Sequence, residues 1–244
     1  MARLAILGCA TGIGAAGARV LAARGDRLAL GDLNPAVCSL AEEVDGHAFV
    51  LDAADPEAVR RFADDAADAL GGLDGAWSNV GIQITGTAES VTAEDLDRSW
   101  AINARAHAVL LGAAIPHLRR AGGGVILVTA STSALLSEPR HLPYTMTKAA
   151  VLALARQVAR DYAPEKIRVN ALCPGWVDTP FNEPAWANYG GREKFLEEVP
   201  RLVPLGRIST PEEIAKLVAF LLSEDASYVT GHAFVADGGE LLVV

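Results

Sequence analysis

Short apolar runs alternate with longer segments of helical periodicity along the 244 residues of the chain. Apolar runs of about four to eight residues between turn signals are typical of buried strands, and apolar residues spaced three and four apart indicate amphipathic helices. The strands that this pattern predicts cover residues 4–7, 27–31, 47–52, 73–77, 125–130, 166–173 and 229–235. The helices that it predicts cover 15–23, 56–70 and 92–119, and two more begin near Tyr144 and Thr210.

The alternation of strand and helix indicates how the strands pair. Strands joined through helices run parallel and are covered on both faces, and ligands bind at the carboxyl ends of such strands. Apolar residues make up 51% of the sequence, which is enough for one large core, and no linker of low complexity divides it. We therefore expect a single α/β domain over residues 1–244, with its ligand site at the carboxyl edge of the sheet.

The segment 180–204 breaks this alternation. It mixes Phe181, Trp186 and further aromatic residues with proline, glycine and charged residues. Irregular segments of this length in compact domains are commonly lids or binding loops. We expect a substrate lid at about 180–204.

The chain is acidic, with a net charge of −9 and a pI near 5.0. Nucleic acids and anionic membranes bind dense patches of lysine and arginine. The negative net charge therefore argues against both partners and favours a small-molecule substrate. The first apolar run ends at Gly8, too early for a signal peptide, and no run reaches the roughly 18 apolar residues of a membrane span. We expect a cytoplasmic protein whose three cysteines, Cys9, Cys38 and Cys173, are reduced core thiols.

A glycine-rich turn joins the first predicted strand to the first predicted helix, with the spacing Gly8-x-x-x-Gly12-x-Gly14. Such a turn lets backbone N–H groups approach a pyrophosphate, and the helix N-terminus adds positive partial charge. The literal G-x-G-x-x-G match from Gly12 to Gly17 starts too far after the strand, so we place Gly17 in the helix, packed against the sheet. The turn predicts a dinucleotide site; the alternative is a purely structural strand-to-helix turn.

An acidic residue, Asp32, ends the second strand 18 residues after Gly14. A carboxylate at this distance accepts hydrogen bonds from a ribose 2′-hydroxyl and repels a 2′-phosphate. No lysine or arginine lies in the glycine turn or next to Asp32. The predicted cofactor is therefore NAD rather than NADP, the alternative being a solvated aspartate in a turn.

Polar residues also follow other predicted strands. Asp52, Asn79 and Ser131 each stand at a carboxyl end, where a parallel sheet binds its ligand. Asn103 lies inside an apolar helix face, which is costly unless its amide is hydrogen-bonded, as in a satisfied core asparagine. From Ser131 to Tyr144 is 13 residues, long enough for the chain to return to the same cleft.

Tyr144 and Lys148 stand four apart at the start of a long apolar segment. Side chains four apart share one face of a helix, so the ammonium lies beside the phenol. A nearby cation favours phenolate and lowers the pKa of a tyrosine from about 10 toward working pH. Alone the pair is a common coincidence, but beside a dinucleotide site it predicts a proton donor and acceptor for an alcohol and its ketone.

Taken together, these residues resemble the short-chain dehydrogenase/reductase family over nearly the whole chain. The motifs stand in the family's order: the glycine turn, Asn79-x-Gly81, Asn103, Ser131, Tyr144-x-x-x-Lys148, Pro174-Gly175 and Asp237-Gly238-Gly239. Leu7 replaces the family's usual threonine, and Ser78-Asn79-Val80-Gly81 replaces the commoner Asn-Asn-Ala-Gly. The related enoyl reductases have a wider Tyr-to-Lys spacing, which counts against their chemistry here.

The resemblance implies a doubly wound (Rossmann) seven-stranded parallel sheet and hydride transfer between nicotinamide and a secondary alcohol or ketone. It implies that Tyr144 is the general acid/base, that Lys148 lowers its pKa and binds the nicotinamide ribose, and that Ser131 holds the substrate oxygen. Asn103 would position a water through which Lys148 exchanges protons. The cofactor residues that it implies are Gly8, Thr11, Gly12, Ile13, Gly14, Asp32, Leu33, Asp52, Ala53, Asn79, Val80, Gly81, Tyr144, Lys148, Pro174, Gly175, Val177 and Thr179.

The sequence leaves the substrate open between a small polyol, a sugar, a hydroxy acid and a cyclic alcohol. The residues expected against it are Ser133, His141, Trp176, Phe181 and Trp186. A catalytically silent dinucleotide-binding sensor or scaffold is the alternative function. Glu138 and His141 suggest a metal site only weakly, because no further His or Cys has ligand spacing with them. We expect them instead to line the substrate pocket or to be solvated. The resemblance also implies a homotetramer or homodimer.

Overall fold

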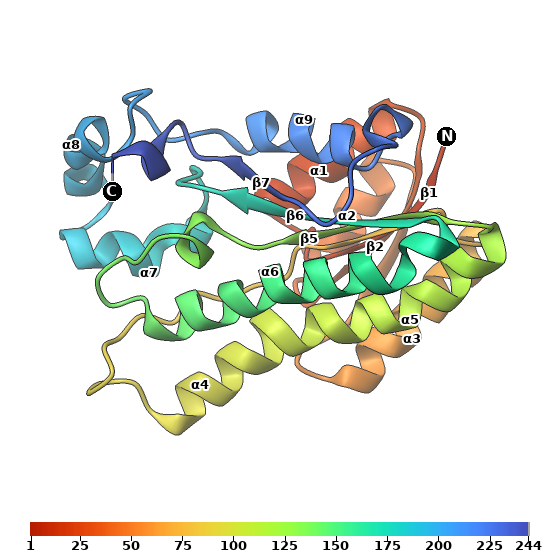
Figure 1. Cartoon of the computed structure of the whole chain (residues 1–244), viewed down its shortest axis with the longest axis horizontal. Helices are drawn as coiled ribbons and strands as arrows, with labels where there is room; N and C mark the ends of the chain where they lie inside the picture. The colour runs from red at the N-terminus through yellow and green to blue at the C-terminus, as the bar shows by residue number, and fades with distance from the viewer. Residues whose placement is uncertain (244) are drawn as a thin grey trace.

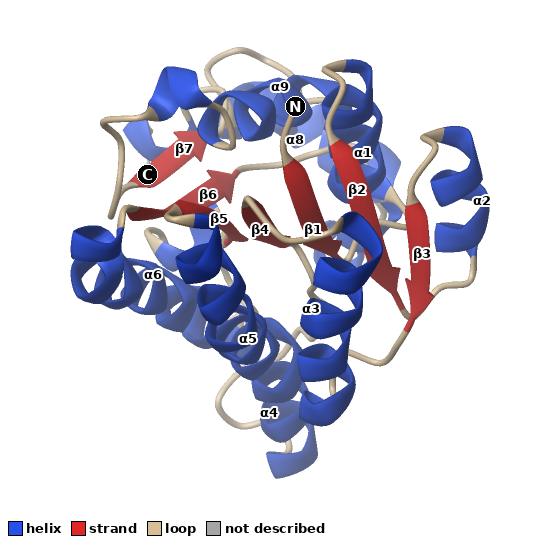
Figure 2. Ribbon diagram, turned by 90° about the vertical axis from the view of Figure 1, so that its right-hand side faces the viewer, coloured by secondary structure: helices blue, strands red, loops and turns tan. Residues whose placement is uncertain are grey.

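Seven parallel strands form one sheet between layers of helices (Figure 1), in the order β3-β2-β1-β4-β5-β6-β7 (Figure 2). The computed structural model describes residues 1–243. This is the doubly wound, seven-stranded sheet that the sequence predicts. The strands are β1 (Arg3–Leu7), β2 (Arg27–Asp32), β3 (His47–Val50), β4 (Gly75–Ser78), β5 (Gly124–Thr129), β6 (Ile167–Pro174) and β7 (Ala233–Ala236).

Helices cover both faces of the sheet, because the central strands are apolar on both sides. One face is covered by α1, α2 and α9 and the other by α3, α5 and α6 (Figure 2). The helices are α1 (Gly12–Ala23), α2 (Ala36–Glu43), α3 (Pro56–Leu70), α4 (Ala93–Trp100), α5 (Ala106–Ala121), α6 (Leu142–Tyr162), α7 (Glu183–Trp186), α8 (Arg192–Leu202) and α9 (Pro211–Leu221).

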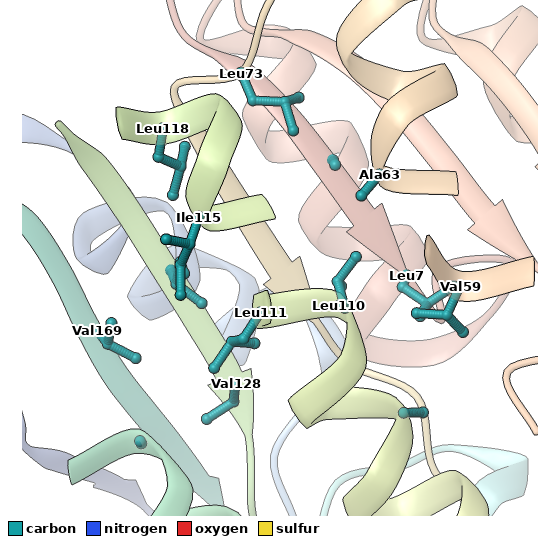
Figure 3. Close-up of a cluster of buried hydrophobic side chains, with 14 of the residues drawn as sticks. Leu7, Val59, Ala63, Leu73, Leu110, Leu111, Ile115, Leu118, Val128 and Val169 are labelled. Carbon is teal, nitrogen blue, oxygen red and sulfur yellow. The ribbon is translucent and has the colours of Figure 1, made fainter. Parts of the chain in front are cut away.

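The larger core cluster joins the sheet to α3, α5 and α6. Leu7 and Val128 of the sheet belong to the same cluster as Val59 of α3 and Leu110 and Leu111 of α5 (Figure 3). Each of these side chains is completely buried or nearly so, and such burial stabilises a fold by about 1.5–3 kcal/mol per large aliphatic side chain. This packing fixes the carboxyl ends of β1 and β5, where the polar residues of the site begin.

Local signals explain where the helices start. Thr210 forms a capping box with Glu213 at the start of α9, as its sequence predicts, and Thr92 forms one with Asp95 at the start of α4. Helix α6 begins at Leu142, with proline in its first turn. Tyr144 therefore lies in the first turn of α6.

Three expectations about the chain need correction. The helix predicted over 92–119 is divided by a π turn at Ala101–Arg105, a feature that apolar periodicity does not reveal. The segment 180–204 is largely helical rather than irregular, because Trp176, Trp186 and Phe195 gather into a small core of their own. Cys38 is exposed on α2, whereas Cys9 and Cys173 are buried thiols as expected.

Among residues 1–243, no helix combines the length and the apolar character needed to cross a lipid bilayer. Gly17 lies in α1, as predicted, and a Cβ atom on it would overlap the ring of Trp77 in β4.

Strands β1 and β4 are neighbours, although β2 and β3 follow β1 in the chain. The connection after β1 leads to β2 on one side, and the connection after β4 leads to β5 on the other side. This divergence opens a crevice at the carboxyl ends of β1 and β4.

Candidate active site

A cavity of about 520 Å³ lies at the carboxyl edge of the sheet, between the glycine turn after β1 and the start of the segment 180–204. Leu7 at the end of β1 and Asn79 directly after β4 contribute to its wall, so the cavity lies at the switch point. The predicted cofactor residues that line it are Gly8, Thr11, Gly12, Ile13, Asp32, Leu33, Asp52, Ala53, Asn79, Val80, Gly81, Tyr144, Lys148, Pro174, Gly175, Val177 and Thr179. Gly14 lies behind this wall, in the first turn of α1.

The glycine turn fits a dinucleotide phosphate. Gly8 and Gly12 have φ values of 87° and 55°, in the left-handed region that favours glycine. Thr11 precedes α1 without capping it through its side chain, and the first turn holds no acidic residue. The first N–H groups of α1 are therefore left without a side-chain acceptor, which is the arrangement that binds an anion.

Gly14 holds this turn closed, because there is no room for a side chain on it. A Cβ atom at Gly14 would overlap the Gly8 carbonyl oxygen and lie 2.6 Å from the Cys9 Cα atom. We expect Gly14→Ala to lower the free energy of unfolding by about 1–3 kcal/mol, the usual cost of overpacking. NAD affinity should fall at least about tenfold, since a displaced turn loses on the order of 1.4 kcal/mol of phosphate binding.

The comparison for Gly14→Ala is Ala22→Gly on the same helix, away from the turn. It should cost about 1 kcal/mol of stability through helix propensity and leave NAD affinity unchanged. Thermal unfolding and calorimetric titration with NAD measure both quantities. A Gly14→Ala protein that binds NAD as tightly as the parent would contradict the role given to this turn.

Asp32 connects the turn to the end of β2. Its Oδ2 atom accepts a hydrogen bond from the Ala10 N–H group at 2.8 Å, and its Oδ1 atom accepts one from Asn34 at 2.9 Å. The carboxylate lines the cavity, where Lys148 is the only lysine or arginine on the wall formed by residues 1–243. A carboxylate and no nearby cation suit a ribose diol better than a 2′-phosphate.

A chain of hydrogen bonds fixes the strand ends around Asn79. The Asn79 side chain donates to the Gly8 carbonyl at 2.7 Å and accepts from the Thr129 hydroxyl at 2.8 Å. Thr129 in turn accepts from the Trp77 indole N–H group at 3.0 Å. These contacts tie β1, β4 and β5 together beneath the glycine turn. Thr129 was missed in the sequence, although a polar residue at the end of an apolar strand is the signal that could have identified it.

Asn103 lies in the π turn and is completely buried. Its Oδ1 atom accepts from the Ile82 N–H group at 2.7 Å, and its Nδ2 atom donates to the Ile82 carbonyl at 2.9 Å. The amide also donates to the hydroxyls of Ser99 and Thr147. Both side-chain polar atoms thus hold the loop after β4, so this side chain is a satisfied buried amide.

Ser131, Tyr144 and Lys148 meet on one stretch of the cavity wall. Ser131 follows β5, and its hydroxyl accepts from the Ser133 N–H group at 3.1 Å. The Lys148 Nζ atom lies 5.6 Å from the centre of the Tyr144 ring and donates to the Thr129 carbonyl at 2.8 Å. The side chains of Tyr144 and Lys148 therefore share a face of α6, as the spacing of four predicts.

The expected lowering of the Tyr144 pKa is wrong. Burial raises the pKa of Tyr144, and the neighbouring Ser131 hydroxyl lowers it by less. Burial also lowers the pKa of Lys148 to about 8. The main cause in both residues is desolvation, which disfavours the charged form of each group.

The residues expected against the substrate divide into two groups. Ser133, Trp176 and Phe181 line the cavity. Trp186 does not, because it packs with Phe195 inside the small core of the segment 180–204. His141 is buried behind the wall. Direct substrate contact is therefore not supported for Trp186 and His141.

Two carboxylates lie in or behind the cavity wall near Ser133, and of these Glu138 was expected at the substrate pocket. Glu138 lines the cavity, and Glu240 is buried next to it, behind Gly175. Glu240 carries no sequence signal, since it follows the closing Gly238-Gly239 pair without any periodicity. Within residues 1–243 no group of three or more His, Cys, Asp or Glu side chains is arranged to hold a metal ion.

The fold and the cavity define an α/β oxidoreductase with a dinucleotide site. A family model described as "Enoyl-(Acyl carrier protein) reductase" matches residues 8–240. Oxidoreductase UcpA of Escherichia coli (strain K12) is 34% identical over 245 residues, which cover 97% of this chain and 93% of that protein. The 2-(R)-hydroxypropyl-CoM dehydrogenase of Xanthobacter autotrophicus is 35% identical over 251 residues, covering 98% of each. The chain belongs to the short-chain dehydrogenase/reductase family.

Solved structures agree with this assignment. Levodione reductase superimposes with a TM-score of 0.92 at 31% identity, covering 99% of this chain and 98% of that one. The ligand-free aldohexose dehydrogenase of Thermoplasma acidophilum superimposes with a TM-score of 0.90 at 28% identity, covering 99% and 94%. Family membership implies a nicotinamide dinucleotide as the cofactor, and the glycine turn fits it.

Proposed function

We propose that the protein is an NAD-dependent dehydrogenase/reductase that interconverts a secondary alcohol and its ketone. The observation that carries the proposal is the convergence of Ser131, Tyr144 and Lys148 on the wall of the cavity that begins at the glycine turn. A phenol, an ammonium and a hydroxyl beside a dinucleotide site provide what removal of an alcohol proton requires.

Each side chain has a separate role in this reaction. Tyr144 takes the proton from the alcohol oxygen in oxidation and returns it in reduction, and Ser131 hydrogen-bonds the same oxygen while charge develops on it. Lys148 lies on the same face of α6, and its ammonium form stabilises the phenolate form of Tyr144 electrostatically. The nicotinamide, when bound, accepts or supplies the hydride. Asn103 holds the loop after β4 and so positions Gly81, which lies next to Lys148.

The named relatives support this class of substrate. The hydroxypropyl-CoM dehydrogenase is named for a secondary alcohol, and the aldohexose dehydrogenase is named for a sugar. The proposal extends to the segment 180–204 as the substrate lid of a single domain, with Phe181 against the Tyr144 ring at a centroid distance of 5.9 Å. It includes a homotetramer or homodimer, as the family resemblance implies, and a cytoplasmic location, which suits the exposed free thiol of Cys38.

Asp32 provides the test of cofactor choice. We expect Asp32→Asn to raise the KM for NAD by about 10–100-fold, because a charge-assisted hydrogen bond contributes about 1.5–3 kcal/mol. The KM for NADP should fall at the same time, since the repulsion of its 2′-phosphate is removed. Initial rates with both cofactors and a panel of secondary alcohols measure the two changes.

The matched control is Asp45→Asn, which removes an exposed carboxylate from the turn before β3. It should leave both KM values unchanged. A parent enzyme that prefers NADP would contradict the assignment of NAD. NAD binding without turnover of any alcohol in a broad panel would instead favour a silent binding protein.

A further inference from the structure

The substrate end of the cavity, beside Ser131 and Ser133, has two buried carboxyl groups in or behind its wall, and hydride transfer requires neither of them. Glu138 is on the cavity wall with its side chain 14% exposed, and Glu240 is 4% exposed. Within residues 1–243 neither carboxylate forms an ion pair with a lysine or arginine. A buried carboxylate without a cationic partner is costly, so the presence of Glu138 on the cavity wall indicates a ligand that it contacts.

The contacts of Glu138 leave it available to such a ligand. The Ser133 hydroxyl donates to its Oε2 atom at 3.2 Å, and both residues line the cavity. The Nδ1 atom of His141 is 3.8 Å from the same oxygen, too far for a hydrogen bond. Burial lowers the pKa of His141, so the ring is neutral and does not balance the charge of Glu138.

Glu240 lies directly behind the same wall. Its Oε2 atom is buried without a hydrogen-bond partner and would be 3.0 Å from a Cβ atom on Gly175, a residue that lines the cavity. The side chains of Thr132 and Trp176, also on the wall, contact the carboxyl group. Glu240 therefore acts on the cavity through its negative potential rather than through direct contact.

The two carboxyl groups share one electrostatic environment. Burial, and then the charge of Glu240, raise the pKa of Glu138 to about 7. Burial also raises the pKa of Glu240. The negative charge of Glu138 also adds to the rise in the pKa values of Tyr144 and Tyr189.

We propose that Glu138 and Ser133 form a subsite for a substrate hydroxyl next to the reacting carbon, so that the substrate is an uncharged polyol or sugar. Glu240 is a positioning residue, because its charge acts on Glu138 from behind the wall. The inference rests on the proposed function and narrows the substrate classes that the sequence leaves open.

The chemistry of the subsite separates these classes. A hydroxyl both donates and accepts, so it satisfies the Glu138 carboxylate and the Ser133 hydroxyl together. A hydroxy acid brings a second negative charge to a wall whose only lysine or arginine within residues 1–243 is Lys148. An ammonium group donates to Glu138 but cannot accept a hydrogen bond from the Ser133 hydroxyl. An alcohol without a second polar group leaves Glu138 desolvated and unpaired.

A series of four-carbon substrates with NAD tests the inference: erythritol, 2-butanol, 3-hydroxybutyrate and 1-amino-2-butanol. We expect kcat/KM for erythritol to exceed that of each of the others at least about tenfold, because a site built to bind a hydroxyl rejects analogues that lack it. A higher kcat/KM for any of the other three overturns the subsite and leaves the proposed function intact. Turnover of none of the four and of no alcohol in the broader panel, with NAD bound, contradicts the proposed function itself.

The variant Glu138→Gln keeps the shape of the side chain and removes its charge. The ratio of kcat/KM for erythritol to that for 2-butanol should fall about tenfold, mainly through the KM for erythritol. In the parent, the KM for erythritol should fall as pH rises through about 7, where Glu138 becomes charged, and this dependence should disappear in the variant. Glu240→Gln should shift the same dependence to lower pH, because it removes a like charge.

Glu197→Gln is the control, since it removes an exposed carboxylate from α8, outside the cavity wall. It should change neither the substrate ratio nor the pH dependence. Equal losses with erythritol and 2-butanol in Glu138→Gln would show that Glu138 only supports the fold of the wall and would overturn the inference.

Discussion

Tyr144→Phe is expected to lower kcat about 10³-fold, within the range of about 10²–10⁴ that a general acid/base contributes. The substitution removes one hydroxyl group and keeps the ring, which is buried with its centroid 5.9 Å from that of Phe181. The protein should therefore stay folded and bind NAD with an unchanged Kd. Steady-state rates with the best alcohol of the panel, together with NAD titration, measure the two effects.

A second tyrosine on α6 supplies the matched control for this experiment. Tyr162 ends the helix and does not line the cavity, so Tyr162→Phe should keep full activity. If Tyr144→Phe also kept full activity, proton transfer by Tyr144 would be excluded and the proposed mechanism would fail.

Lys148→Met is expected to abolish most activity and, at neutral pH, to make the protein more stable. The Lys148 ammonium is 2% exposed, and its pKa is lowered from 10.5 to about 8 by burial. This difference corresponds to a destabilisation of about 3 kcal/mol, at about 1.4 kcal/mol per pH unit. Removing Nζ leaves the Thr129 carbonyl without this donor, which costs about 1–3 kcal/mol. A net gain of about 1 kcal/mol at pH 7 is the expected balance.

The pH dependence of stability tests this explanation with a definite sign. Between pH 8 and 10.5, Lys148 is neutral in the folded protein and still protonated in the unfolded chain. The unfolded state then binds more protons, so the stability of the parent rises with pH across this window, by about 3 kcal/mol relative to the variant. Below pH 8 the difference is constant. Urea unfolding at several pH values measures it.

Lys216→Met, at an exposed position on α9, is the control and should not change the slope. Parallel stability curves for the parent and Lys148→Met between pH 8 and 10.5 would contradict the lowered pKa of Lys148. Retained activity in Lys148→Met would exclude its part in the reaction.

The parallel sheet and its ligand edge could be predicted because they depend on local patterns. Apolar runs at strand length, the glycine turn and the capping residue Thr210 are each set by a few neighbouring residues. The edge on which Asp32, Asn79 and Ser131 lie follows from the parallel pairing of their strands. The spacing of four likewise placed Tyr144 and Lys148 on one helix face.

The errors arose where distant residues decide the environment. The direction of the Tyr144 pKa depends on burial by elements far away in the sequence, and spacing shows only the nearby cation. Trp186 was expected on the pocket wall because it is aromatic, yet it packs with Phe195 in a core that only the folded segment creates. The π turn at Asn103 depends on contacts with Ile82 and Thr147, which no periodicity encodes.

The sequence by itself therefore determined the α/β architecture, the dinucleotide turn and the residues available for acid/base chemistry, because each depends on local spacing. The tertiary structure alone decided which of these side chains share a cavity and how strongly each is desolvated. It also brought Glu240 close enough to Glu138 for their charges to interact, although they are 102 positions apart in the sequence. Burial and charge proximity are properties of the packed chain, and for that reason the negative subsite is visible only in the fold.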